Sequence, residues 1–276
     1  MLLGRKKNQR KLTDALAGQE PPQMPAAVLK LMQLMRDPDS ETTEIGEALS
    51  WQPDLVVRVL KTVNSAAFGL ARQVDSVAHA VAILGRSRVE QLVLGVAIKA
   101  NLPTSSAPGF DAQRFWEAAF FRAALARGLA SRLHPADEAT SFTAGLLQDM
   151  AVPLLAHARP DYGKVLVEWH GTPTAHLHRI EKDALGWSHD EIGGHLAEAW
   201  DLPQRLSRLI QAHHDASDLN VPAALRLVAL HRETERELGL DGIVCGARED
   251  YGLDSDTTIR LVEESEQQAR DLAKLL

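Results

Sequence analysis

Four side chains in the C-terminal half of the sequence are of types that bind metal ions. Asp149 supplies a carboxylate, and His189, His213 and His214 supply imidazoles. Carboxylate oxygens and imidazole nitrogens are ligands that divalent transition metals take in proteins. The residue before Asp149 is Gln148, however, and a neutral amide is a weak ligand beside imidazole. Gln148 is therefore not expected to act as a metal ligand.

The same residues have a structural alternative, which the sequence favours over metal binding. Asp149 is expected at a helix terminus or in a buried hydrogen bond, because buried polar groups are normally satisfied by a neighbour. His213 is expected to be partly buried and paired, and His214 to face solvent. Three further histidines have no partner at ligand-like spacing and are expected on the surface: His170, His176 and His178.

Helices must position these residues, because apolar residues recur at helical spacing from about residue 24 to the end of the chain. One stripe contains Val28, Leu31, Met32 and Met35. Similar stripes follow along the chain, and Pro203 is suited to the first turn of a helix. Alternating β-branched runs joined by tight turns are nearly absent. The sequence therefore predicts an all-α protein.

A run rich in Pro, Ser, Thr and Gly, NLPTSSAPGFDA at 101–112, divides the helical pattern. It predicts an N-terminal helical lobe at 20–100, a linker at 101–111 and a C-terminal helical lobe at 112–276 with a terminal helix. Residues 1–19 contain a basic run and few apolar residues, which favours a disordered tail. An electrostatic arm for an acidic partner is the alternative for this tail.

Composition excludes several classes of function. The formal net charge is −7, which argues against a nucleic-acid binder, since such a protein presents a basic face. No apolar run has the length of a membrane span, and no secretory signal pattern opens the chain. The single cysteine, Cys245, is consistent with a reducing compartment. We therefore expect a cytoplasmic protein.

Longer motifs resemble the HDOD family (HD-related output domain), a bacterial signalling module. In the N-terminal lobe they are PPQMPAAVLKLMQLMRDPDS at 21–40, VVRVLKTVNSAAFG at 56–69 and VDSVAHAVAILG at 74–85. Within them, Asn64, Ser65, Phe68 and Gly69 match one family block. The C-terminal segment GWSHDEIGGHLAEAWDLPQRLSRLIQAHHD at 186–215 also matches, as does Glu181. The resemblance spans about residues 20–235 and implies a two-lobed helical fold.

The resemblance also implies that the C-terminal lobe is a degenerate HD phosphohydrolase bundle. The stretch FTAGLLQDMAVPLL at 142–155 is similar to the helix that carries the His-Asp pair of that superfamily, with Gln148 in place of the histidine. Ala118 stands where an upstream histidine is expected, and His231-Arg232 where a late aspartate is expected. The degenerate site thus comprises Ala118, Gln148, Asp149, His189, His213 and His214. No metal and no other cofactor is expected.

Three functions follow from the resemblance. The first is a non-catalytic signal-transduction module that contacts signalling proteins in trans, such as receiver, kinase or cyclic-dinucleotide enzymes, through a groove between its lobes. The second is a nucleotide or cyclic-dinucleotide receptor that uses the degenerate pocket. Its phosphate contacts would come from Arg122, Arg127 or Lys182. The third is residual metal-dependent phosphohydrolase activity, which the missing imidazoles disfavour.

Overall fold

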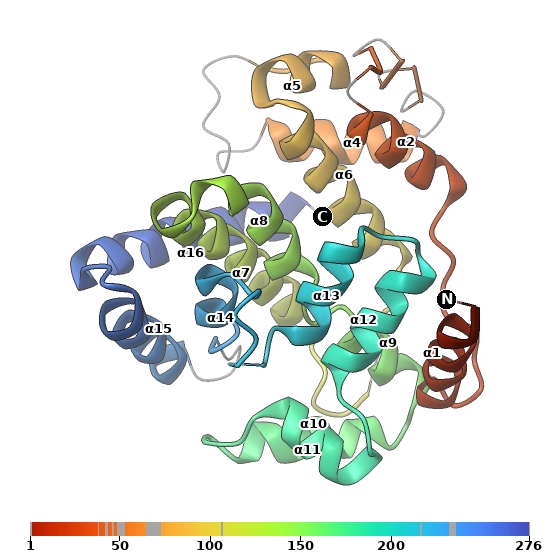
Figure 1. Ribbon diagram of the computed structural model, residues 1–276, viewed down its shortest axis with the longest axis vertical. Helices are drawn as coiled ribbons and strands as arrows, with labels where there is room; N and C mark the ends of the chain where they lie inside the picture. The colour runs from red at the N-terminus through yellow and green to blue at the C-terminus, as the bar shows by residue number, and fades with distance from the viewer. Residues whose placement is uncertain are drawn as a thin grey trace.

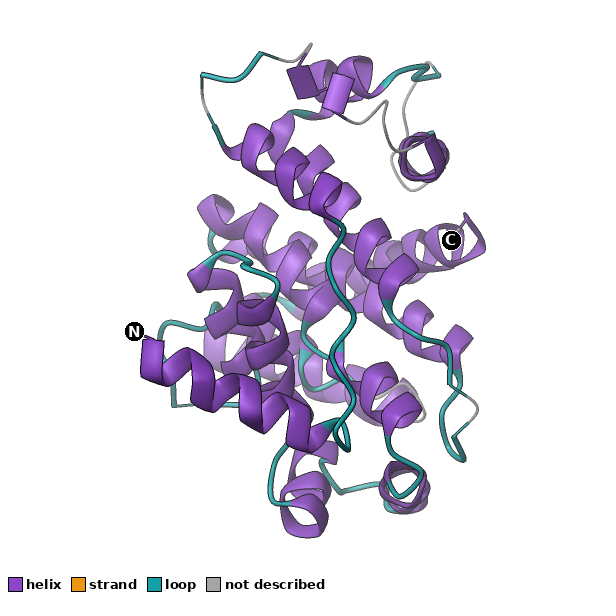
Figure 2. Ribbon diagram, turned by 90° about the vertical axis from the view of Figure 1, so that its right-hand side faces the viewer, coloured by secondary structure: helices purple, strands orange, loops and turns teal. Residues whose placement is uncertain are grey.

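The computed structural model describes residues 2–275 except 38, 42–43, 46, 49–52, 65–72, 106, 216 and 232–235. Throughout these residues the regular secondary structure is helical and no strand is present, which confirms the all-α prediction. Figure 2 shows this as helices joined by loops. No helix of the described chain combines the length and the apolar character that crossing a membrane requires.

In the described part of the chain, the first lobe, at the top of Figure 1, contains the helices α2 (Ala26–Arg36), α4 (Pro53–Val63), α5 (Val77–Leu84) and α6 (Arg86–Asn101). The stripe Val28, Leu31, Met32 and Met35 is buried, as its spacing predicts. Ser76 caps α5 by accepting the backbone N–H of His79. Gly85, at φ +82°, makes the sharp turn from α5 into α6, a conformation that favours glycine.

Asn64 joins the two ends of the segment that precedes α5. Its side-chain amide donates to the carbonyl of Val74 at 2.7 Å and accepts the backbone N–H of Val74 at 2.7 Å. These two bonds give Asn64 a structural role. The partners of Asn64 in its sequence motif, Ser65, Phe68 and Gly69, lie outside the described residues.

The second lobe is built on α7 (Ala112–Leu133), a 22-residue helix that packs against helices on several sides. Its neighbours are α8 (Glu138–Leu147), α14 (Ala223–Val228) and α16 (Ser255–Leu275). The remaining helices are α9 (Ala151–Ala158), α10 (Tyr162–Gly171), α11 (Leu177–Leu185), α12 (His189–Ala199), α13 (Gln204–Ala212) and α15 (Arg236–Tyr251), with a short 3₁₀ turn at Pro135–Asp137.

Helix α6 belongs to both lobes. It contacts α2, α4 and α5 on one side and α8 on the other, and Figure 1 shows it descending from the first lobe into the second. At Gly95 the helices approach so closely that an added Cβ would lie 2.5 Å from Cδ2 of Leu146. The lobes therefore share one continuous apolar core.

Residues 2–15 form a helix, α1 (Leu2–Ala15), so the prediction of a disordered tail at 1–19 is wrong for them. This helix packs against α12, and Leu12, Ala15 and Leu16 are fully buried. The side-chain amide of Asn8 donates to Glu198 Oε2 at 2.9 Å. The prediction gave more weight to the basic composition of the segment than to its short apolar stripe. Packing of that stripe against a distant helix stabilises a helix that would not be stable alone.

Candidate functional site

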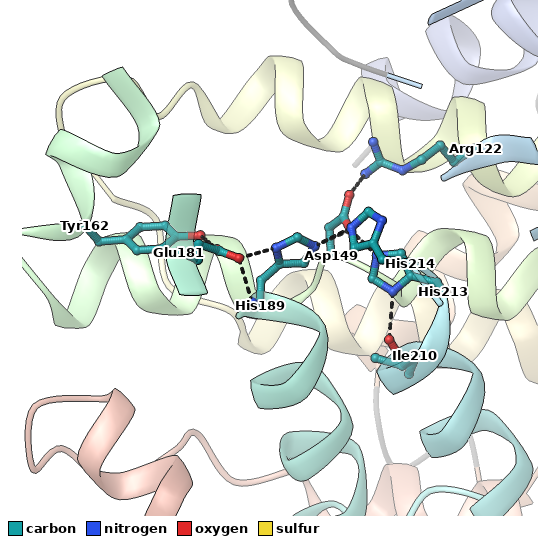
Figure 3. Close-up of polar contacts among 8 residues, drawn as sticks. All are labelled: Arg122, Asp149, Tyr162, Glu181, His189, Ile210, His213 and His214. Carbon is teal, nitrogen blue, oxygen red and sulfur yellow. Dashed lines mark hydrogen bonds and ion pairs between the residues drawn. The ribbon is translucent and has the colours of Figure 1, made fainter. Parts of the chain in front are cut away.

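The polar residues predicted from the sequence meet where four segments of the second lobe converge (Figure 3). Asp149 lies in the turn between α8 and α9, and His189 is the first residue of α12. His213 and His214 follow α13, and Arg122 extends from α7. Gly145 permits this convergence, because a Cβ there would stand 3.0 Å from the backbone oxygen of Arg122.

Asp149 is the centre of the cluster. Its Oδ2 lies 2.8 Å from Nη2 of Arg122, whose side chain is only 4% exposed. Its Oδ1 lies 3.3 Å from Nε2 of His189 and 3.2 Å from Nε2 of His213. Burial opposes the charged carboxylate, but Arg122 and the two imidazoles outweigh burial and hold the pKa of Asp149 well below its ordinary value. Asp149 is therefore a carboxylate with a cationic partner.

His189 lies between two carboxylates. Its Nδ1 is 2.7 Å from Oε2 of Glu181, which also accepts the backbone N–H of His189 at 2.8 Å. Tyr162 donates its hydroxyl to the other oxygen of Glu181. Burial disfavours the imidazolium, but Glu181 and Asp149 overcome it and raise the pKa of His189 well above its ordinary value.

The buried Glu181 also explains how α12 begins. Ser188 occupies the N-cap position but makes no capping bond with its side chain. The first N–H of the helix, that of His189, is satisfied by the Glu181 carboxylate instead. A carboxylate is additionally favoured there by the helix dipole. Glu181 on α11 thus fixes both the start of α12 and the orientation of the His189 ring.

The two consecutive histidines have different surroundings. His213 is buried and paired, as predicted, and its Nδ1 donates to the carbonyl of Ile210 at 2.7 Å. His214 does not face solvent, which corrects the prediction. Its Nε2 lies 3.1 Å from Nε2 of His189, and its ring stacks on His178 with centroids 4.2 Å apart. Burial lowers the pKa of His214 well below its ordinary value, so the ring is neutral.

Each predicted site position can now be placed. Asp149, His189, His213 and His214 each offer one ligand atom, and these atoms lie within 4.8 Å of one another. Gln148 is next to them and 2% exposed. Ala118, 4% exposed, lies one helical turn before Arg122 on α7 and brings no polar side chain.

A cavity of about 290 Å³ opens beside the cluster. The lining residues are Phe115, Arg122, Gln148, Asp149, Val152, Trp169, Pro173, Thr174, Ala175, His176, Leu177, His178, His189, His214, Ala229, Leu230 and His231. His176 and His178 were expected as unrelated surface residues, and their place in this wall corrects that expectation. His170 is not in the wall, and its Nε2 lies 2.9 Å from the carbonyl of Gly109.

Only one of the three cations suggested for phosphate binding reaches this cavity. Arg122 lines it, already paired with Asp149. Arg127 donates to Gln268 at 2.8 Å, and Lys182 pairs with Glu191 at 2.5 Å. At the expected position of a late aspartate, His231 lines the cavity, and Arg232 lies outside the described residues.

The sequence did not single out Tyr162, nor the pairing of Arg122 with Asp149. Tyr162 is fully buried and forms one end of the chain Tyr162–Glu181–His189–Asp149–Arg122. Tyr162 belongs to no spacing pattern in the sequence, so no signal marked it. Arg122 lies four residues after Ala118 and therefore on the same face of α7, and this spacing is the signal that could have marked it as a site residue.

Comparisons with known proteins agree with the family motifs found in the sequence. A family model described as "HDOD domain" matches residues 22–216. An uncharacterized protein of Treponema pallidum is 27% identical over 195 residues, which cover 70% of this chain and 37% of that protein. The chain thus spans well under half the length of this curated relative.

Two solved structures resemble the whole chain in fold. An HDOD domain protein with unknown function from Geobacter sulfurreducens is 21% identical, with a TM-score of 0.76 and coverage of 100% of this chain and 99% of that one. A Marinobacter aquaeolei protein described as a "putative signal transduction protein" is 21% identical, with a TM-score of 0.75 and coverage of 98% and 66%. Since the family model covers most of the sequence, the chain belongs to the HDOD family.

Proposed function

We propose that this protein is a non-hydrolytic signal-transduction module that acts through contacts with other proteins. The observation that carries the proposal is the ion pair between Arg122 and Asp149. In a metal-dependent HD enzyme the carboxylate at this position would bind a divalent cation. Here a buried guanidinium, which is always charged, already neutralises the carboxylate and repels a second cation placed beside it.

The other ligand positions also argue against a bound divalent cation. Ala118 offers no ligand atom, and the amide of Gln148 is a poor substitute for imidazole. Three of the four residues that offer these ligand atoms are held by protein partners: His189 through Nδ1 by Glu181, His213 through Nδ1 by Ile210, and Asp149 through Oδ2 by Arg122. These residues do not fit a binuclear metal centre, so we assign the cluster a structural role.

A groove between the lobes is the contact surface that we propose. It has a volume of about 200 Å³ and lies between α6, α8 and α13, with Ser87, Leu94, Thr140, Arg205 and Leu206 among its lining residues. Leu94 and Leu206 form an apolar floor, and Arg205 adds a charge at the rim, where its side chain is 56% exposed. An apolar floor with a charged rim suits a helix or loop of a partner. Signalling partners agree with the description of the Marinobacter aquaeolei protein.

One experiment tests both halves of the proposal. A photo-crosslinking residue at Thr140 is expected to capture a signalling protein in the native cell. Arg205→Glu is expected to reduce that capture, whereas Lys164→Glu, an exposed charge on α10, leaves it unchanged. The folded double variant Asp149→Asn/His213→Asn is also expected to capture the partner normally.

Two results would contradict this function. The first is a double variant that folds but captures nothing while Arg205→Glu behaves as wild type. The second is protein purified without added metal that contains stoichiometric iron, manganese or zinc, or that hydrolyses phosphomonoesters or cyclic dinucleotides in a chelator-sensitive reaction.

A further inference from the structure

The cavity beside Asp149 has two chemically different walls. Phe115, Val152, Trp169 and Leu230 supply apolar and aromatic surface on its lining. Arg122, Gln148, His178 and His214 supply polar groups. A volume of about 290 Å³ is at the lower end of the range for small-molecule sites, and such sites combine mostly apolar walls with a few convergent polar groups. A small metabolite would fit, whereas a large one would extend into solvent.

Several buried polar atoms in this wall have no hydrogen-bond partner among the described residues. They include Oε1 of Gln148, Nε of Arg122 and Nδ1 of His178. Gln148 is 2% exposed and Arg122 is 4% exposed, so neither side chain can turn freely to bulk water. An unpaired buried donor or acceptor is costly, and native proteins normally satisfy such groups with water or a ligand. The acceptor Oε1 of Gln148 and the donor Nε of Arg122 could therefore both bond a ligand that presents a donor and an acceptor.

The charges around the cavity are already balanced. Arg122 pairs with Asp149, and His189 pairs with Glu181. Among the described residues that line the cavity, a polyphosphate or other multiply charged anion would lose its hydration and find no unpaired arginine or lysine in return. The cavity therefore favours an uncharged ligand.

Flat rings define the shape of the cavity. His178 and His214 stack with their planes 25° apart, and Trp169 contributes a third ring to the lining. Aromatic and heteroaromatic faces recognise planar ligands by offset stacking. The flat rings and the balanced charges of the lining thus both favour an uncharged planar ligand.

We propose that this cavity binds an uncharged planar nitrogen heterocycle that donates and accepts hydrogen bonds along one edge, with the amide of Gln148 as its principal polar partner. A carboxamide presents an acceptor and a donor side by side, the complement of such an edge. The proposal does not depend on the contact function of the inter-lobe groove, because the groove and the cavity share no lining residue.

The test is calorimetric titration of the full chain with adenine, hypoxanthine and uracil, and with AMP and a cyclic dinucleotide for comparison. At least one free heterocycle is expected to bind saturably, and the phosphates are expected to add no affinity. Gln148→Leu, which keeps the approximate size but removes the amide, is expected to weaken binding at least about tenfold. Gln113→Leu, an exposed glutamine on α7, serves as the matched control and is expected to bind as wild type.

A second variant keeps the proposal testable if Gln148→Leu does not fold. Thr174 lines the cavity from an exposed position, so Thr174→Trp is expected to block binding without disturbing the core. Thr172→Trp, exposed on the same loop and outside the lining, is the control. The proposal is overturned if no heterocycle binds saturably, if Gln148→Leu and Thr174→Trp both bind as wild type, or if the phosphorylated ligands bind much more tightly than the free bases.

Discussion

At the scale of single residues, the site is a chain of alternating charges. Arg122, Asp149, His189 and Glu181 follow one another with opposite charges at each step, and Tyr162 closes the chain with a hydroxyl donor. A buried charge is tolerated only where a partner compensates it. Each member of the chain is therefore needed by its neighbours.

Arg122→Met is expected to lower the free energy of unfolding by about 3–5 kcal/mol, because it leaves the Asp149 carboxylate buried without its cation. Urea unfolding followed by circular dichroism measures the loss. Arg208→Met, which removes an exposed arginine of α13, is expected to change it by no more than about 0.5 kcal/mol. In the double variant Arg122→Met/Asp149→Leu, part of the lost stability returns. A loss below about 1 kcal/mol for Arg122→Met would show that the pair is not needed.

The lowered pKa of His178 predicts how the free energy of unfolding depends on pH. Burial lowers its pKa from 6.5 to about 4 in the folded protein. Between these values the unfolded chain binds a proton that folded His178 does not, so the free energy of unfolding falls as the pH falls. His189, with a raised pKa, has the opposite sign: its contribution is complete below pH 6.5 and is lost as the pH rises through its folded pKa.

The measurement is the slope of unfolding free energy between pH 7 and pH 4.5. His178→Phe is expected to flatten the slope, because the titrating group is removed from both states. His157→Phe, at an exposed position, is the comparison and is expected to keep the wild-type slope. Equal slopes for wild type and His178→Phe would refute this assignment.

At the scale of elements, close approach between α7 and α8 brings Asp149 to Arg122. Gly145 makes the approach possible, since a Cβ would lie 3.0 Å from the Arg122 carbonyl oxygen and 3.2 Å from Cβ of Ala126. The small-residue run at the end of α8 is therefore a packing requirement of the site. A glycine is otherwise unfavourable inside a helix.

Gly145→Ala is expected to destabilise the protein by about 1–3 kcal/mol, because the helices must separate to admit the methyl group. Gly171→Ala is the matched control, since nothing lies within 4 Å of a Cβ there. The control is expected to be neutral or to stabilise by up to about 1 kcal/mol through helix propensity. Thermal unfolding of the two variants separates the effects, and a stabilising Gly145→Ala would contradict the packing role.

At the scale of the whole molecule, the lobes are joined by more than the connection between α6 and α7. Helix α6 packs on both sides, and Trp200, the C-cap of α12, donates its indole N–H to the carbonyl of Pro22, just before α2, at 2.7 Å. Ser105 within the connection donates to the carbonyl of Ala156 at 2.8 Å. These contacts tie the lobes and the connection into one packed unit.

The protein is therefore expected to unfold in a single cooperative transition. Calorimetry, far-ultraviolet circular dichroism and tryptophan fluorescence should give the same midpoint. Two well-separated calorimetric transitions, each matching one lobe expressed alone, would show instead that the lobes fold independently.

The sequence by itself determined the helical fold, the family and most members of the site. Helical periodicity, the Ser76 cap and the Pro203 start are short-range signals, because they depend on residues within a turn or two of one another. The motifs identified Asp149, His189, His213 and His214 as one group. They also predict that Ala118 and Gln148 stand at two ligand positions without supplying an imidazole.

Only the tertiary structure decided which residues meet across the bundle. Arg122 pairs with Asp149, and His178 stacks on His214, over long sequence separations. Such contacts follow from how helices pack, which no local pattern encodes. The same reason explains α1, whose burial depends on α12, nearly two hundred residues away along the chain. Because distant helices pack together, the predicted tail is a helix, and His176 and His178 lie in the wall of a cavity.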